Sequence, residues 1–177
     1  MENLIIYEKN KKIEFSHKEC LENHKGTLFA GVALSYKMLS SFLTEENRHE
    51  RGGWYFYTGI GKNGQAIIDT AKFVLGEDTV IDMAEEVLSK VQAPEGPNGG
   101  KYYFLFENKE QGKRYTFQVK EGMVPEEFYM YSRKLKKAGS KADEELIQKT
   151  NEVRNQVAQE ILKAKGSDIF IRNGEID

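Results

Sequence analysis

The 177-residue chain has a formal net charge of −2 at neutral pH, with 39% hydrophobic and 31% charged residues. This balance is typical of a folded protein and excludes the bulk positive charge that attracts proteins to nucleic acid or anionic membranes. No apolar run reaches the roughly 18 residues of a transmembrane helix. The N-terminal charges do not have the order of a signal peptide. We therefore expect one cytoplasmic domain, residues 1–177, without a nucleic-acid or membrane partner.

The single cysteine, Cys20, limits the chemistry that the chain can carry. One cysteine excludes an intrachain disulfide and a zinc site of the Cys-x-x-Cys type. A lone cysteine is most often a small buried apolar side chain. The alternative is a reactive thiol.

The first 26 residues predict a hairpin and a short helix. Two β-prone runs, residues 4–7 and 13–15, are separated by a polar turn. The Ser-x-x-Glu capping-box pattern that starts at Ser16 predicts a helix of about two turns, ending near His24. Gly26 is expected to stop this helix in a left-handed conformation.

A second, buried helix is predicted directly after this stop. Thr27 is the expected N-cap, and residues 28–43 are apolar on nearly all sides, which is typical of a helix at the centre of a domain. Gly31 and Ala33 would let another backbone approach closely, and helix packing is the simplest reason for such small residues. Tyr36 lies in the same helix, so its hydroxyl needs a polar partner.

A polar loop containing His49 leads to an aromatic strand, residues 54–58. The glycine pattern Gly-x-Gly-x-x-Gly follows at residues 59–64. This pattern binds dinucleotides when it lies within a βαβ unit. The later chain predicts antiparallel hairpins instead of repeated βαβ units, so nucleotide binding is the third and weakest functional hypothesis.

The next segment predicts two helices and a flexible loop. Residues 66–75 form a helix that Gly76 stops, and Asp69 within it is either a surface acid or a carboxylate directed into a pocket. Residues 82–91 predict a further helix. Residues 93–100 contain two prolines and several glycines, and they form either a lid or a surface turn.

Residues 101–107 and 113–119 form the clearest predicted hairpin. In its second strand, Tyr115, Phe117 and Val119 alternate with polar residues, which predicts one packed and one hydrated sheet face.

Two helices and a strand complete the chain. Pro125 begins a helix that Gly139 ends, and residues 143–165 form the longest helix, with a narrow apolar stripe. That helix either lies on the sheet or pairs with a second subunit. Residues 167–172 predict a terminal strand. The pattern as a whole predicts an α+β fold, with an antiparallel sheet of aromatic strands packed against several helices.

Side chains of metal-ligand type occur in and near the first helix. Cys20 and His24 are four residues apart on one helix face, a spacing at which two side chains share a metal ion. His17 lies about 10 Å from His24 along the helix axis, too far to join them. His49 and Asp69 are the candidates for completing such a site. The other interpretation is that this segment is a solvated helix face.

Three segments resemble the signatures of the FmdE family, whose members are associated with formylmethanofuran dehydrogenase. The segment LFAGVALSYKM, residues 28–38, is similar to the apolar helix that follows a His-Gly-His-Leu-Cys pattern in that family. AIIDTAK, residues 66–72, is similar to the Cys-x-x-Asp-Ala-Ile-Gln signature. Residues 100–113 are similar to a third signature, a Gly-Lys pair followed by two strands. The resemblance extends from about residue 15 to the end of the chain.

The resemblance implies an α+β core, a homodimer and a metal site built from the first two signatures. This chain departs from the family at the ligands. Thr27 stands in place of a histidine, while Phe29 and Ala66 stand in place of cysteines, and none of these side chains replaces a thiolate or imidazole on zinc. His24 aligns with the remaining histidine only after a shift of one residue. Asp69 is kept.

We therefore expect an FmdE-like protein that binds a small molecule or a protein partner, without the metal, in a pocket formed by residues 24–38 and 64–76. The predicted pocket residues are Gly26, Thr27, Phe29, Gly31, Tyr36 and Asp69. The alternative is a metal-binding protein, or a metal-dependent enzyme, that serves an anaerobic oxidoreductase system. Its candidate ligands, for zinc or another transition metal, are Cys20, His24 and Asp69. The first hypothesis requires no cofactor, and neither hypothesis identifies a catalytic residue.

Overall fold

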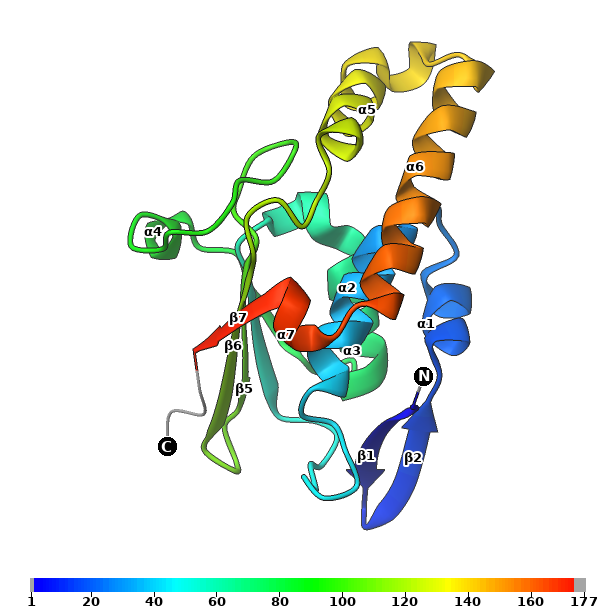
Figure 1. The fold of residues 1–177 in the computed structure, drawn as a ribbon. Coiled ribbons are helices and arrows are strands. Elements are labelled where there is room, and N and C mark those ends of the chain that lie inside the picture. The colour runs from blue at the N-terminus through cyan, green and yellow to red at the C-terminus, as the bar shows by residue number, and fades with distance from the viewer. Residues whose placement is uncertain (1, 174–177) are drawn as a thin grey trace.

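A five-stranded sheet with the strand order β4-β3-β5-β6-β7 is the framework against which the helices pack (Figure 1). The structure is a computed structural model that describes residues 2–173. Neighbouring strands are antiparallel except β3 and β4, which are parallel. A separate hairpin of β1 and β2 precedes the first helix. The strands are β1 (Leu4–Glu8), β2 (Lys11–Phe15), β3 (Trp54–Thr58), β4 (Val80–Asp82), β5 (Tyr103–Asn108), β6 (Lys113–Val119) and β7 (Phe170–Asn173).

The main helices lie on one side of the sheet, and α5 with the first part of α6 forms a helical hairpin that extends beyond it (Figure 1). The α-helices are α1 (His17–His24), α2 (Phe29–Ser40), α3 (Gln65–Leu75), α4 (Glu85–Leu88), α5 (Glu126–Ala138), α6 (Glu144–Lys163) and α7 (Gly166–Ile169). Two 3₁₀ turns, η1 (Gly61–Gly64) and η2 (Gly139–Lys141), precede α3 and α6.

Aromatic side chains fill the space between the sheet and the helices. Phe56, Phe104, Phe106 and Phe117 are fully buried, and the rings of Phe56 and Phe106 stack with their centroids 4.3 Å apart. Of the alternate residues of β6, Arg114 and Gln118 remain partly exposed, while Thr116 is buried. The predicted α+β fold, with one packed face of aromatic strands, is thus confirmed.

Helix α2 is the central helix, and α6 lies along it. The Nζ of Lys37, near the end of α2, donates a 2.7 Å hydrogen bond to the carbonyl of Ala164, the residue that caps α6. The apolar stripe of α6, made by Val153, Val157 and Ile161, is buried within the chain. The stripe therefore packs α6 against its own domain, and against α2 in place of the sheet that the sequence suggested.

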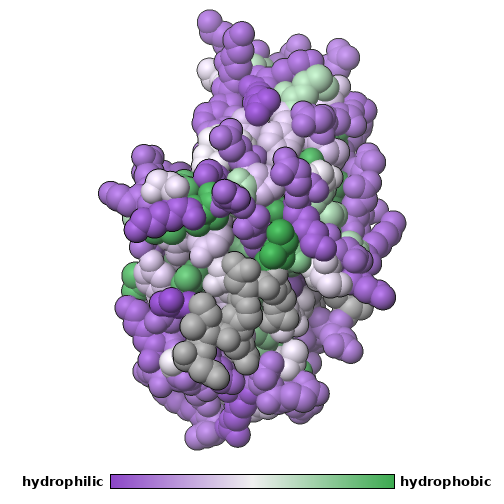
Figure 2. All heavy atoms as spheres, turned by 60° about the vertical axis from the view of Figure 1, so that its left-hand side comes forward, coloured by the Kyte–Doolittle hydropathy of each residue, from purple (hydrophilic) through white to green (hydrophobic). Residues whose placement is uncertain are grey.

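The surface of the described residues has few large apolar side chains. Figure 2 shows a mainly hydrophilic face with apolar residues in small groups. The most exposed of them are Val80 on β4 and Ile171 on β7, at 56% and 44%. Within residues 2–173, no helix is long and apolar enough to cross a membrane.

The join between α1 and α2 differs from the prediction. The capping box of Ser16 and Glu19 is present, but Lys25, not Gly26, adopts the left-handed conformation with φ of 55°. Gly26 lies against the His24 ring, where a Cβ would come within 2.8 Å of Nε2. The glycine is therefore explained by close contact with His24. Thr27 is not the N-cap either, because α2 begins after Leu28 without a side-chain cap.

Two further predicted elements change when the chain folds. Most of the predicted helix 82–91 is absent, because Val80–Asp82 pairs with β3 as strand β4 and only α4 is helical. The Asp82 carboxylate accepts hydrogen bonds from the Tyr55 hydroxyl and the Ala84 amide, which fixes the end of the strand. The predicted terminal strand 167–172 is only partly present. The short helix α7 forms first, and strand β7 begins after it, at Phe170.

Candidate functional site

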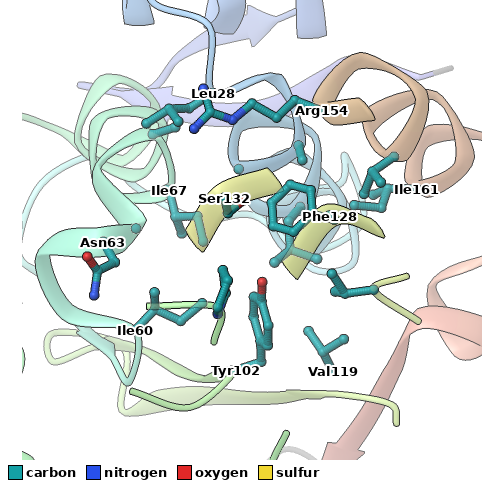
Figure 3. A pocket seen from close by; sticks show the side chains of 18 of the residues that line it. Leu28, Ile60, Asn63, Ile67, Tyr102, Val119, Phe128, Ser132, Arg154 and Ile161 are labelled. Carbon is teal, nitrogen blue, oxygen red and sulfur yellow. The ribbon is translucent and has the colours of Figure 1, made fainter. Parts of the chain in front are cut away.

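A cavity of about 100 Å³ lies between the sheet, the start of α2, the start of α3 and the α5–α6 hairpin (Figure 3). Most of its lining is apolar, because each of these elements directs its buried face toward the same point. Figure 3 shows Ile60 and Ile67 on one side of the cavity and Val119 at the sheet. Phe128 on α5 and Ile161 near the end of α6 form the helical side. The cavity therefore combines segments that are distant in sequence.

Gly31 and Ala66 set the distance between two of these elements. A Cβ built on Gly31 would lie 3.0 Å from the Cβ of Ala66, so the glycine lets α2 and α3 approach closely. Both residues also line the cavity. Gly31 thus serves helix packing, as the sequence suggested, and its lack of a side chain also leaves space for the cavity beside this contact.

Two hydroxyl groups, on the largely buried residues Tyr102 and Ser132, face the cavity, and neither forms a hydrogen bond within the described residues. The buried side-chain atoms that lack a partner among these residues lie elsewhere, on His17, His24 and Thr58. Tyr102 is only 5% exposed, and its hydroxyl is directed from the sheet side toward the side chains of α5 (Figure 3). Burial raises the pKa of this phenol, so it stays protonated and able to donate. Ser132 on α5 is 6% exposed and lies across the cavity. Both hydroxyls are therefore available to a molecule in the cavity.

Among the described residues that line the cavity, Arg154 is the only charged one. Its side chain extends from α6 across the cavity toward Leu28 (Figure 3). One nitrogen, Nη1, donates a 3.3 Å hydrogen bond to the Thr27 hydroxyl. Among residues 2–173 the guanidinium forms no ion pair with a carboxylate. Burial lowers the pKa of Arg154, which reflects the loss of hydration around an uncompensated cation.

The structure places the predicted pocket residues in several locations. Gly31 lines the cavity, and Thr27 contacts it through Arg154. Phe29 lies outside it, in a shallow depression formed with the outer face of α6. The Tyr36 hydroxyl lies 2.9 Å from the carbonyl of Glu2 and 3.2 Å from that of Phe15, so it supports the N-terminal hairpin.

The remaining two pocket candidates, Gly26 and Asp69, lie beside His24. The Asp69 Oδ2 is 2.8 Å from His24 Nδ1, and its Oδ1 accepts a 2.6 Å hydrogen bond from Gln65. The second ring nitrogen, His24 Nε2, is buried and has no hydrogen-bond partner. Asp69 lies in a surface depression with Gln65 and Lys72, and so its carboxylate does not enter the cavity.

The candidate metal ligands do not form a complete site. No group of three His, Cys, Asp or Glu side chains that can hold a metal ion occurs between residues 2 and 173. Cys20 is fully buried, and burial raises the pKa of its thiol to about 12, so it is a neutral thiol at physiological pH. His49 belongs to a different cluster, with Nδ1 2.7 Å from Gln111 Oε1 and Nε2 2.9 Å from the Tyr115 hydroxyl.

The glycine pattern after β3 has a structural role at its first position. The amide of Gly59 donates to the Tyr103 carbonyl, and the Gly59 carbonyl accepts from the Lys101 amide. A Cβ at Gly59 would lie 2.7 Å from the Lys101 carbonyl oxygen. This glycine therefore allows two backbones to approach. The pattern does lie between parallel strands β3 and β4 with α3 as the crossover, the single parallel connection of the described sheet.

Sequence reasoning did not identify Arg154, Tyr102 or Ser132. One signal for Arg154 was present, because it directly follows Val153 in the apolar stripe of α6. A cation at the border of such a stripe lies close to what the stripe covers. Tyr102 and Ser132 had no comparable signal, since aromatic strand residues and helix serines are common.

Comparison with known proteins adds no relative: no family model, no curated protein and no solved structure matches this chain.

Proposed function

We propose that this chain is a binding protein that holds a small, mainly apolar molecule in the cavity beneath the α5–α6 hairpin. The observation that carries the proposal is an apolar cavity faced by two hydroxyls, those of Tyr102 and Ser132, that form no hydrogen bond within the described residues. A few polar groups in an apolar lining are typical of a small-molecule site, where they orient the ligand.

The lining residues support binding over catalysis. They include no Asp, Glu, His, Cys or Lys, so the cavity offers neither a general base nor an activated nucleophile. The polar groups that it does offer are two hydroxyls, the amides of Asn63 and Asn98, and the Arg154 guanidinium. The Asn63 amide already donates to the Asn98 carbonyl at 3.1 Å. Groups of this kind orient a ligand without transforming it.

The resemblance to the FmdE family is a further proposal, supported by the position of two of the three altered ligands. Ala66, which the resemblance aligns with a ligand cysteine, lies in the cavity wall, and Thr27 lies at its margin. The third position, Phe29, lies outside the cavity. On this proposal the cavity is the remnant of the family's metal pocket, with apolar groups where ligands stood. The implied homodimer and cytoplasmic location are also predictions, and light scattering on the purified protein would test the first.

An apolar probe tests the proposed binding. Titration of 1-hexanol, followed by chemical shifts of the cavity methyl groups, should show saturable binding to the unchanged protein. Val157→Phe extends a cavity-lining side chain on α6 into the cavity and should weaken that binding at least tenfold. Ile147→Phe is the matched control, because Ile147 is on the same helix but 41% exposed. Equal binding of hexanol to all three proteins, or no saturable binding to any, would contradict the proposal.

A further inference from the structure

Arg154 has hydrogen-bond donors that no other described residue uses. A guanidinium has five N–H donors, and only one hydrogen bond, to Thr27, forms within residues 2–173. The side chain is partly buried and lies in the lining of a mainly apolar cavity. A guanidinium with this partial loss of hydration gains from a carboxylate beside it. Lys37, a partly buried cation on α2, differs from Arg154 because it already donates a hydrogen bond to the Ala164 carbonyl.

The arrangement of donors fits a carboxylate better than a phosphate. A planar guanidinium forms two parallel hydrogen bonds to the two oxygens of a carboxylate. The Thr27 hydroxyl accepts from Arg154 and keeps its own proton for a third hydrogen bond. A phosphate would call for further donors, and the cavity lining contains no second cation.

We infer that the ligand is a small monocarboxylate, with its carboxylate on Arg154 and Thr27 and its apolar tail in the cavity between Ile60 and Phe128. This inference rests on the proposed function. The cavity volume, about 100 Å³, limits the tail. An apolar cavity of about 150 Å³ accommodates the six carbon atoms of benzene, so this cavity accommodates about four. Hexanoate is the probe of choice, because it carries four carbon atoms beyond the one next to its carboxylate.

Calorimetric titration with hexanoate and with 1-hexanol separates this inference from the proposed function. The two probes share one tail and differ in the anionic group. For the unchanged protein, hexanoate should bind at least tenfold more tightly than hexanol. In Arg154→Gln this preference should disappear, and in Arg154→Lys it should be reduced, because an ammonium group lacks the planar fork. Arg114→Gln is the control, since Arg114 pairs with Glu107 on the sheet and is not in the lining.

Each outcome has a definite meaning. Equal affinity of hexanol and hexanoate for the unchanged protein would overturn the inference and leave the proposed function standing. Binding of neither probe would overturn both. A hexanoate preference that persists in Arg154→Gln would overturn the role of Arg154. Displacement of hexanoate by an equal concentration of inorganic phosphate would overturn the assignment to carboxylates. Circular dichroism of each variant checks that it is folded.

Discussion

Arg154 on α6 donates its hydrogen bond to Thr27, 127 positions earlier in the chain, at the join that precedes α2. The contact forms at one end of the α2–α6 pair, and the bond from Lys37 to Ala164 forms at the other. The two contacts hold α6 along α2, and the cavity lies beside the first of them. The same residue therefore joins two distant segments and presents a cation to the cavity.

The hydroxyl of Tyr102 is predicted to contribute little to stability in the absence of ligand. Because it makes no hydrogen bond within the described residues, Tyr102→Phe should change the free energy of unfolding by less than about 0.5 kcal/mol. Tyr36→Phe is the matched variant, since its hydroxyl reaches the carbonyls of Glu2 and Phe15. That substitution should cost about 1 kcal/mol or more. Urea denaturation measures both, and a larger loss for Tyr102→Phe than for Tyr36→Phe would contradict the assignment.

The contact between Gly31 and Ala66 is predicted to couple the two positions. Gly31→Val adds atoms where a Cβ already lies 3.0 Å from Ala66 Cβ. Such overpacking should destabilise the protein by about 1–3 kcal/mol. Ala66→Gly in the same chain should recover part of that loss, because it removes the opposing methyl group. Strict additivity of the two substitutions in thermal or urea denaturation would show that the close contact is not the cause.

Cys20 is predicted to make stability fall at alkaline pH. Burial raises the pKa of its thiol from 9.0 to about 12, so above pH 9 the unfolded chain loses this proton more readily than the folded one. The contribution is therefore fully present below pH 9 and is lost as the pH rises toward 12, at up to about 1.4 kcal/mol per pH unit. Cys20→Ala should show a shallower decline between pH 9 and 10.5. If the free energy of unfolding falls with pH at the same slope in both proteins, the raised pKa of Cys20 is refuted, whatever the absolute stabilities.

The metal hypothesis yields a prediction of its own. Because no three potential ligands gather among the described residues, protein purified without a metal-affinity tag should contain no stoichiometric zinc, nickel or iron. A chelator should leave the melting temperature unchanged. Stoichiometric metal that is lost in a Cys20→Ala, His24→Ala double variant would favour the alternative function over the apolar cavity.

Local patterns predicted most elements of the fold correctly. The strand at residues 54–58 and the hairpin of β5 and β6 follow from aromatic and alternating residues, which are short-range signals. The join at residues 24–28 was predicted less well, because its outcome depends on tertiary contacts. His24 occupies the space beside Gly26, and Arg154 engages the hydroxyl that would otherwise cap α2.

The cavity was predicted only in part, for a related physical reason. Gly31 was identified from its small side chain and Ala66 from the resemblance to the FmdE signature, and both line the cavity. The polar lining residues come from three separate segments: Tyr102 directly precedes β5, Ser132 is on α5 and Arg154 is on α6. They meet only because α5 packs against α6, and α6 packs against α2. A pattern within one segment carries no information about such a meeting of segments.

A crystal structure of the protein saturated with hexanoate tests the central claim most directly. The account predicts electron density for one molecule in the cavity, with both carboxylate oxygens within hydrogen-bonding distance of the Arg154 guanidinium and the alkyl chain against Ile60 and Phe128. An empty cavity at saturating hexanoate, or a carboxylate bound away from Arg154, would contradict it.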